Sequence, residues 1–213
     1  MIVNAMPIRV LTIDDHPILR EGIAAMLSSE PDIEVVGGAS NAEAGLEAFR
    51  RLLPDVTLMD LQMPGMGGLA GVRALRSEYT TARVIILTTF RGDANARDSM
   101  AAGAAGYLLK SALRDELLDC IRKVHAGGRY VSAEVCADVA THLGNELLTP
   151  RELRTLQLLS EGKENKRIAS ELGISIETVK SHVSRIFEKL GCHNRTEAIR
   201  IGIRRGILGQ MTQ

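Results

Sequence analysis

The chain is poor in aromatic residues and cysteine, and each shortage excludes a class of protein. Of the 213 residues only 3% are aromatic and none is Trp, which argues against binding of single-stranded nucleic acid on stacked aromatic rings. The three cysteines, Cys120, Cys136 and Cys192, are odd in number and widely spaced. They predict neither a disulfide framework nor a zinc site, and a reducing cytoplasm fits them best.

Long apolar runs and an export signal are missing too. No apolar run approaches the roughly 18 residues of a membrane-spanning helix, and no basic segment near the start leads into a long apolar stretch. We therefore expect a cytoplasmic protein that does not enter a membrane. Hydrophobic residues are 45% of the chain, which is enough to build cores and excludes a disordered protein.

Positive and negative charges balance over the whole chain but not along it. Residues 1–128 hold 13 basic and 16 acidic groups, whereas residues 148–213 hold 12 basic and 7 acidic groups. A length of 213 residues suits two small domains. The uneven charge indicates that the second of them carries the positive excess.

A short apolar run followed by a helical pattern recurs five times from residue 8, as expected for buried parallel strands joined by helices. The predicted strands are 8–13, 33–37, 55–59, 83–88 and 105–109, and the predicted helices lie near 17–29, 41–53, 68–78, 93–102 and 112–126. This order predicts an α/β domain over residues 1–128, with a five-stranded, doubly wound parallel sheet of flavodoxin-like type. Ligands of such sheets bind outside the carboxyl ends of the strands.

The pattern changes after the fifth helix. Residues 129–147 are polar and predict a linker that is helical in part, from Ala133 to Leu143. Thr149, Pro150 and Glu152 then form a capping box, which marks the start of a second domain over 148–213. The predicted helices of this domain are 150–161, 166–172, 176–190 and 195–205. Because no strand-like run appears among them, the second domain is predicted to be all-α.

Five polar side chains stand at the carboxyl ends of the predicted strands. Asp14 and Asp15 follow the first strand, and Asp60, Thr88 and Lys110 lie at the ends of the third, fourth and fifth. Because parallel strands end at one edge, these groups meet in one cleft, where three carboxylates repel one another unless a hard cation such as Mg²⁺ neutralises them. With that cation, a carboxylate can attack a phosphoryl group while a lysine and a hydroxyl bind its oxygens. Asp60, Lys110 and Thr88 suit these roles.

Each residue alone has a simpler explanation. Single acids at strand ends are more often helix caps or turn formers, Thr88 alone would be a strand residue, and Lys110 alone a solvated charge. Five polar side chains at the ends of four strands favour a site instead. His16 is assigned no chemistry, because hard cations do not favour imidazole.

Residues 7–127 resemble the receiver domain of bacterial two-component response regulators. The matching motifs are Asp14-Asp15-His16-Pro17, Met59-Asp60-Leu61-Gln62-Met63-Pro64, Leu87-Thr88-Thr89 and Gly106-Tyr107-Leu108-Leu109-Lys110. The resemblance implies that Asp60 accepts a phosphoryl group from a sensor histidine kinase. It also implies roles for the surrounding residues: Asp14, Asp15, Asp60 and the backbone carbonyl of Gln62 bind Mg²⁺, Thr88 and Lys110 contact the phosphoryl group, and Tyr107 is a switch.

The second domain has the sequence pattern of a helix-turn-helix, with a short helix, a turn at Gly173 and a longer helix capped by Ser175. One face of the longer helix is an apolar stripe that packs in the core. The other face offers short polar groups and cations to a DNA groove and its phosphates. The candidate DNA contacts are Thr178, Lys180, Ser181, His182, Ser184, Arg185 and Lys189, together with Lys166 of the shorter helix.

A basic helix face is usually only a solvated surface, but here the capping box, the turn chemistry and the positive charge agree. The stretch from Leu148 to Ile207 resembles the LuxR-type four-helix DNA-binding domain. Its matching motifs are Leu148-Thr149-Pro150-Arg151-Glu152, Glu161-Gly162, Asn165-Lys166, Thr178-Val179-Lys180-Ser181-His182 and Lys189-Leu190-Gly191. Together the two resemblances point to the NarL/FixJ regulators, which implies that 176–190 is a recognition helix for double-stranded DNA and that 195–205 pairs two subunits.

Two alternatives to a phosphorylation-controlled transcription regulator stay open. A magnesium phosphohydrolase of the haloacid-dehalogenase type would also form an aspartyl phosphate, but it would want a second Asp where Gln62 stands. We therefore expect a protein that is not an enzyme. A pseudo-receiver with constitutive DNA binding is disfavoured, because no acidic, Thr or Lys position of the motif is missing.

Overall fold

The computed structural model describes residues 6–89, 93–112, 114–141 and 147–208. These divide into two compact units, one made of residues 6–89 with 96–136 and the other of residues 93–95 with 137–208. Among the described residues, no helix combines the length and the apolar character that crossing a membrane requires.

A six-stranded parallel sheet forms the centre of the first unit, in the order β2-β1-β3-β4-β5-β6. The strands are β1 Ile8–Ile13, β2 Ile33–Ala39, β3 Val56–Asp60, β4 Val84–Thr88, β5 Gly106–Leu109 and β6 Tyr130–Val131. The predicted doubly wound parallel fold is confirmed, but the predicted count of five strands is wrong. The sixth strand pairs with β5 inside the segment predicted as a linker, and two residues are too few to show a hydrophobic period.

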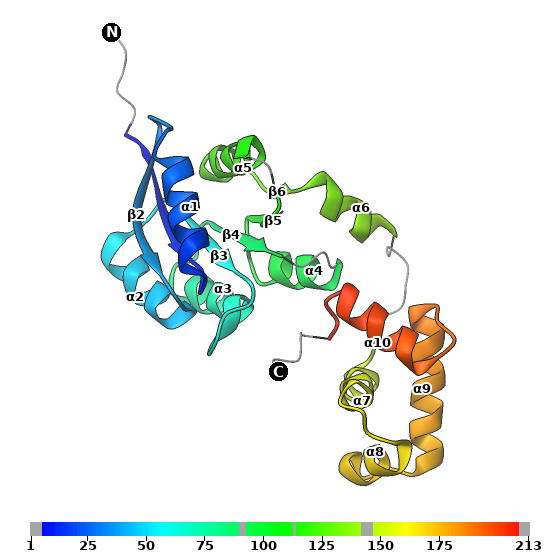
Figure 1. Cartoon of the computed structure of the whole chain (residues 1–213). Coiled ribbons are helices and arrows are strands. Elements are labelled where there is room, and N and C mark those ends of the chain that lie inside the picture. Colours follow the sequence, from blue (N-terminus) through cyan, green and yellow to red (C-terminus); the bar gives the residue numbers. More distant parts are fainter. Residues whose placement is uncertain (1–5, 90–92, 113, 142–146, 209–213) are drawn as a thin grey trace. The chain divides into compact units, whose positions relative to one another are not determined.

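Helices cover both faces of this sheet, with α1 and α5 on one side and α2, α3 and α4 on the other (Figure 1). The helices are α1 Pro17–Leu27, α2 Ala42–Leu52, α3 Gly67–Glu78, α4 Asp93–Ala101, α5 Arg114–His125 and α6 Ala133–Thr141. Every residue of β3, β4 and β5 is buried, because these central strands have neighbours on both faces. The last residues of the helix predicted to reach Leu143 lie outside the described part of the chain.

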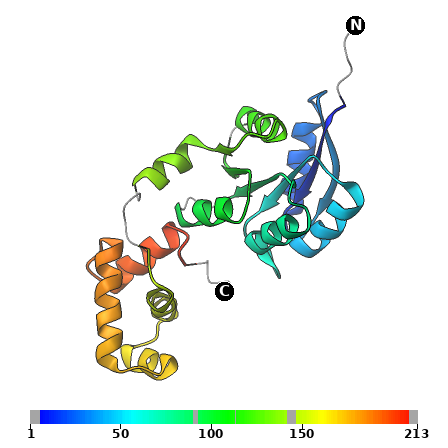
Figure 2. The same cartoon turned by 180° about the vertical axis from the view of Figure 1, so that it is seen from behind.

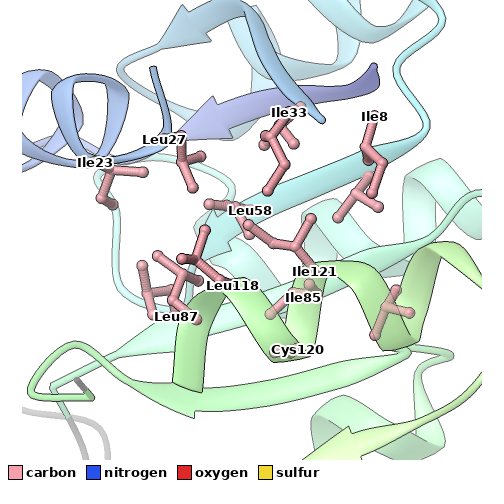
Figure 3. Packing of buried hydrophobic residues seen from close by; sticks show 14 of the residues in the cluster. Ile8, Ile23, Leu27, Ile33, Leu58, Ile85, Leu87, Leu118, Cys120 and Ile121 are labelled. Carbon is pink, nitrogen blue, oxygen red and sulfur yellow. The ribbon is translucent and has the colours of Figure 1, made fainter. Parts of the chain in front are cut away.

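The core beneath α1 and α5 is aliphatic. Ile23 and Leu27 of α1 meet Leu58 of β3, Ile85 of β4 and Ile121 of α5 (Figure 3). Such close packing makes the strands a rigid platform, so the side chains at their carboxyl ends are held in fixed positions.

The second unit contains α7 Pro150–Ser160, α8 Asn165–Leu172, α9 Ile176–Leu190 and α10 Arg195–Arg204. The predicted capping box at the start of α7 is confirmed, with Thr149 and Glu152 each accepting a hydrogen bond from the other's backbone N–H. Gly173 ends α8 at φ 65° and Ser175 caps α9, so the predicted helix, turn and helix are present. The long α9, orange in Figure 2, packs against both α7 and α8.

Candidate functional site

The polar side chains predicted at the strand ends do occupy one edge of the sheet. Asp60 is the last residue of β3 and Thr88 the last of β4, while Asp14 and Lys110 follow directly after β1 and β5. Since β1, β3, β4 and β5 are consecutive neighbours in the sheet, these residues come from four adjacent strands. The sequence pattern and the parallel topology together therefore assemble the site.

Lys110 binds two carboxylates at once. Its Nζ lies 2.6 Å from Asp14 Oδ2 and 2.8 Å from Asp60 Oδ2. All three side chains are at most 8% exposed, so water screens their charges weakly. The backbone N–H of Lys110 donates to the Thr88 carbonyl at 2.6 Å, which fixes the lysine beside β4. Two negative charges share one positive charge, and the buried cluster keeps a net negative charge.

Burial and the neighbouring charges together set the pKa of Asp60. Burial raises the pKa of the Asp60 carboxyl, the hydrogen bond and charge of Lys110 lower it, and the Asp14 carboxylate raises it again. The backbone N–H of Gln62 donates to Asp60 Oδ1 at 3.3 Å and lowers the pKa slightly. The net pKa of Asp60 lies above its usual value, so the ionised carboxylate is less stable here than in water.

Asp15 adds a buried oxygen that accepts no hydrogen bond from the described residues, its Oδ1. The ring Nδ1 of His16 lies 2.9 Å from that oxygen without hydrogen-bond geometry, and 3.1 Å from Asp14 Oδ1. One ligand atom from each of Asp14, Asp15, His16 and Asp60 falls within 4.8 Å of the others. Closely spaced carboxylate oxygens, one of them without a hydrogen bond, fit a hard cation such as Mg²⁺. His16 is 66% exposed and suits an orienting role better than a ligand role.

Two residues that shape the site were absent from the predicted set. The Arg20 guanidinium, on α1, donates to the Asp14 carbonyl. A Cβ at Gly68 would lie 2.0 Å from the Asp60 carbonyl oxygen, so only glycine lets the first turn of α3 approach Asp60. The Gly67-Gly68 pair shortly after a predicted strand is a sequence signal of such an approach, whereas Arg20 carries no comparable signal.

Tyr107 lies in β5 and is fully buried, as is Thr88 at the end of β4. Burial raises the pKa of the Tyr107 hydroxyl, so the ring stays neutral. The roles of Tyr107 as a switch and of the Gln62 carbonyl as a ligand stay predictions.

The candidate DNA contacts differ in exposure. Lys166, Lys180, Ser181, Ser184 and Arg185 are exposed, while Thr178 and His182 are half-buried. Thr178 donates its backbone N–H to Ser175 Oγ at 3.0 Å, so it also helps to start α9. Lys180 pairs with Glu177 at 3.1 Å, and both side chains are exposed.

Lys189 is the exception in this set, because its side chain is only 14% exposed. Its Nζ lies 2.9 Å from Glu152 Oε2 and donates to the Leu147 carbonyl at 3.1 Å. Burial raises the pKa of Glu152, but hydrogen bonds from Thr149 and Lys189 outweigh it and hold this pKa below its usual value. The pair ties α9 to the start of α7. A DNA contact by Lys189 stays a prediction, and it would require the lysine to leave Glu152.

Comparisons with known proteins match both halves of the chain. Residues 10–122 match the response regulator receiver domain, and residues 146–201 match the luxR family of bacterial regulatory proteins. The chain is 42% identical to the transcriptional regulatory protein LiaR of Bacillus subtilis (strain 168), over 90% of this chain and 94% of LiaR. It is 38% identical to the nitrate/nitrite response regulator protein NarL of Escherichia coli (strain K12), over 92% and 94% of the two chains.

A solved structure agrees with these matches. RcsB from Salmonella enterica serovar Typhimurium, bound to the promoter P1flhDC in the presence of the phosphomimetic BeF₃⁻, is 25% identical, with a TM-score of 0.74 over 92% of this chain and 98% of RcsB. The related proteins are regulators of transcription and not enzymes, which rules against the phosphohydrolase alternative.

Proposed function

Since the chain belongs to the NarL/LiaR-type two-component response regulators, which join a receiver domain to a LuxR-type DNA-binding domain and regulate transcription, we propose that phosphorylation of Asp60 by a sensor histidine kinase controls it. The phosphorylated protein forms a homodimer and binds a specific site on double-stranded DNA. We assign residues 1–128 to the receiver domain, 129–147 to the linker and 148–213 to the DNA-binding domain, and the first residues of the linker form the edge strand β6 of the receiver sheet.

The observation that carries this proposal is the position of Asp60, a buried carboxylate beside Lys110 at the end of β3, which pairs with the strand that ends at Thr88. In the transfer, an Asp60 oxygen forms a bond to phosphorus while the bond from phosphorus to the kinase histidine nitrogen breaks, and that nitrogen keeps the electron pair. Lys110 pairs with the phosphoryl oxygens and Thr88 donates its hydroxyl to one of them.

Asp14, Asp15, Asp60 and the Gln62 carbonyl would hold Mg²⁺ in this site. When bound, Mg²⁺ supplies the positive charge that lets a phosphoryl group approach three carboxylates. The geometry supports this assignment, because Lys110 alone faces both Asp14 and Asp60, and the Asp15 Oδ1 nearby accepts no hydrogen bond from the described residues.

A phosphorylation experiment tests the assignment of Asp60. Incubation with acetyl phosphate and Mg²⁺ should add one phosphoryl group, seen by intact-protein mass spectrometry, and Asp60→Asn or chelation should abolish it. Asp55→Asn is a matched control, since Asp55 lies just before the amino end of the same strand, where its carboxylate accepts the Arg9 N–H. Undiminished phosphorylation of Asp60→Asn would show that another residue is the acceptor.

DNA binding is tested on the exposed face of α9. Lys180→Ala should weaken specific binding by about 1–3 kcal/mol if Lys180 contacts a base edge, while Lys166→Ala should weaken all sequences alike and reduce the salt dependence. Arg154→Ala, an exposed cation on α7, is the control. Footprints should show two half-sites about 10 base pairs apart or a multiple of that spacing, and a single half-site occupied by a monomer would contradict the dimer.

A further inference from the structure

A small cleft lies at the edge of the receiver sheet opposite to Asp60. Its walls come from the residues just before β4, β5 and β6, together with the ends of α3 and α5. Because all three strands are parallel, their amino ends share one edge, and none of the site residues described above reaches it. The cleft therefore needs an explanation of its own.

Arginines dominate this cleft, since Arg76, Arg83 and Arg129 all line it and no acidic residue does. Elsewhere in the same unit arginines meet acids, as in the pair of Arg50 with Glu78 at 2.7 Å. Within the described part of the chain, neither Arg83 nor Arg129 makes a side-chain hydrogen bond or ion pair. Three arginines thus line a cleft that no described acidic residue lines.

Hydrogen bonds hold one side chain and one backbone segment of the cleft in place. Nη1 of Arg76 donates to the Thr80 and Ala82 carbonyls, which leaves the other N–H groups of this guanidinium for a ligand. Gly103, at φ 104°, lies against the same arginine, and a Cβ there would come within 2.9 Å of its Nε. The backbone of Arg83 is fixed as well, because its carbonyl accepts the Thr57 N–H at 2.9 Å.

Gly127 and Gly128 line the side of the cleft near the end of α5, and neither has a side chain that could cover it. The following residues are held to the sheet by the Tyr130 N–H, which donates to the Ala105 carbonyl at 3.0 Å. Arg129 is therefore anchored through its neighbour, while its own side chain is exposed and able to close over a ligand.

We infer that this cleft, between Arg76, Arg83 and Arg129, binds a phosphate group. Guanidinium groups match the geometry of phosphate oxygens and bind them with paired hydrogen bonds. The cleft has a volume of about 170 Å³, well below the roughly 300–1,000 Å³ of sites that enclose drug-sized ligands. It therefore fits orthophosphate, or the phosphate of a monoester whose remaining part lies outside. This inference does not depend on the proposed phosphorylation of Asp60.

The test is a titration of the full-length chain with orthophosphate, followed by the amide signals of Gly103, Gly127 and Gly128 in a ¹⁵N NMR spectrum. These signals should shift and saturate. Arg83→Gln and Arg129→Gln should each weaken the apparent affinity by about tenfold, the size of one lost charge-assisted hydrogen bond. Arg73→Gln, an exposed arginine on α3 that does not line the cleft, is the matched control and should leave the affinity unchanged.

Two results would overturn the inference. One is a linear, unsaturated shift that chloride reproduces at equal ionic strength, which would show general screening. The other is equal binding by Arg73→Gln and by the double variant Arg83→Gln with Arg129→Gln, which would place the phosphate elsewhere, for instance on α9. A parallel titration with adenosine 5′-monophosphate distinguishes the two possible ligands, a phosphomonoester and free orthophosphate. Tighter binding than orthophosphate would indicate that the cleft binds a phosphomonoester, and equal binding would indicate that it binds the free anion.

Discussion

Each of the two units contains a buried lysine that pairs with a buried carboxylate. The two clusters differ in how fully hydrogen bonds and positive charge compensate that carboxylate. Glu152 lies 2.9 Å from Lys189, accepts the Thr149 N–H as well, and has a pKa below its usual value. Asp60 shares Lys110 with Asp14 and has a pKa above its usual value. Folding alone completes the first cluster, whereas the second still lacks positive charge. Burial by itself therefore does not separate the two clusters, but the balance of charge does.

The largest expected effect comes from breaking the satisfied pair. Lys189→Met keeps most of the side-chain volume but leaves the buried Glu152 carboxylate without its cation, so the free energy of unfolding of the second unit should fall by about 3 kcal/mol. Urea denaturation of the full chain, with hydrogen exchange of the α9 amides to identify the unit, measures this loss. A fall below about 0.5 kcal/mol would mean that the pair is as weak as a surface one.

The unsatisfied cluster should respond to the missing charge. If Mg²⁺ binds the folded acids and not the unfolded chain, a tenfold excess over its dissociation constant stabilises the first unit by about 1.4 kcal/mol. Thermal unfolding with and without Mg²⁺ should show this rise, and Asp15→Asn should reduce it.

Asp98→Asn is the control for that experiment, because Asp98 is an exposed acid on α4. An equal Mg²⁺ effect on the Asp15 and Asp98 variants would show that the cation binds outside this cluster. The difference in charge balance between the two units would then not explain the Mg²⁺ effect.

Without Mg²⁺, Asp60→Asn should stabilise the first unit at neutral pH, since it removes a carboxylate whose ionised form is disfavoured by burial in this site. The sign follows from the raised pKa. Between the unfolded and the folded pKa the folded chain binds more protons, so the wild type loses stability as the pH rises through that window. The gain of the variant should therefore be present at neutral pH and absent well below pH 3.8, the ordinary pKa of Asp. Chemical denaturation at a series of pH values checks it, and a gain confined to acid would reverse the assignment.

The two clusters were also unequally predictable from the sequence. Asp14, Asp60, Thr88 and Lys110 could be placed together because each follows a short apolar run, and parallel strands end at one edge. The pairing of Lys189 with Glu152 could not, because the two residues lie 37 positions apart in the chain, and helical periodicity does not predict which residue of another helix a half-buried side chain contacts. The capping box gave Glu152 its local role, yet Lys189 was predicted only as a DNA contact. The strand β6 could not be predicted either, because two residues are too few to show the alternation of a strand.

The smallest expected effect concerns a third lysine and acid pair, Lys180 with Glu177, which lies on the exposed surface of α9. Water and salt screen this pair, so Lys180→Met should change the free energy of unfolding by no more than about 0.5 kcal/mol. The same denaturation assay that detects the loss in Lys189→Met should therefore barely register it. If Lys180 contacts a base, Lys180→Met should lower the DNA affinity more than Lys189→Met does. If Lys180→Met lost both stability and DNA binding, the substitution would have distorted α9. If it lost DNA binding at unchanged stability, Lys180 would act in DNA recognition and not in folding.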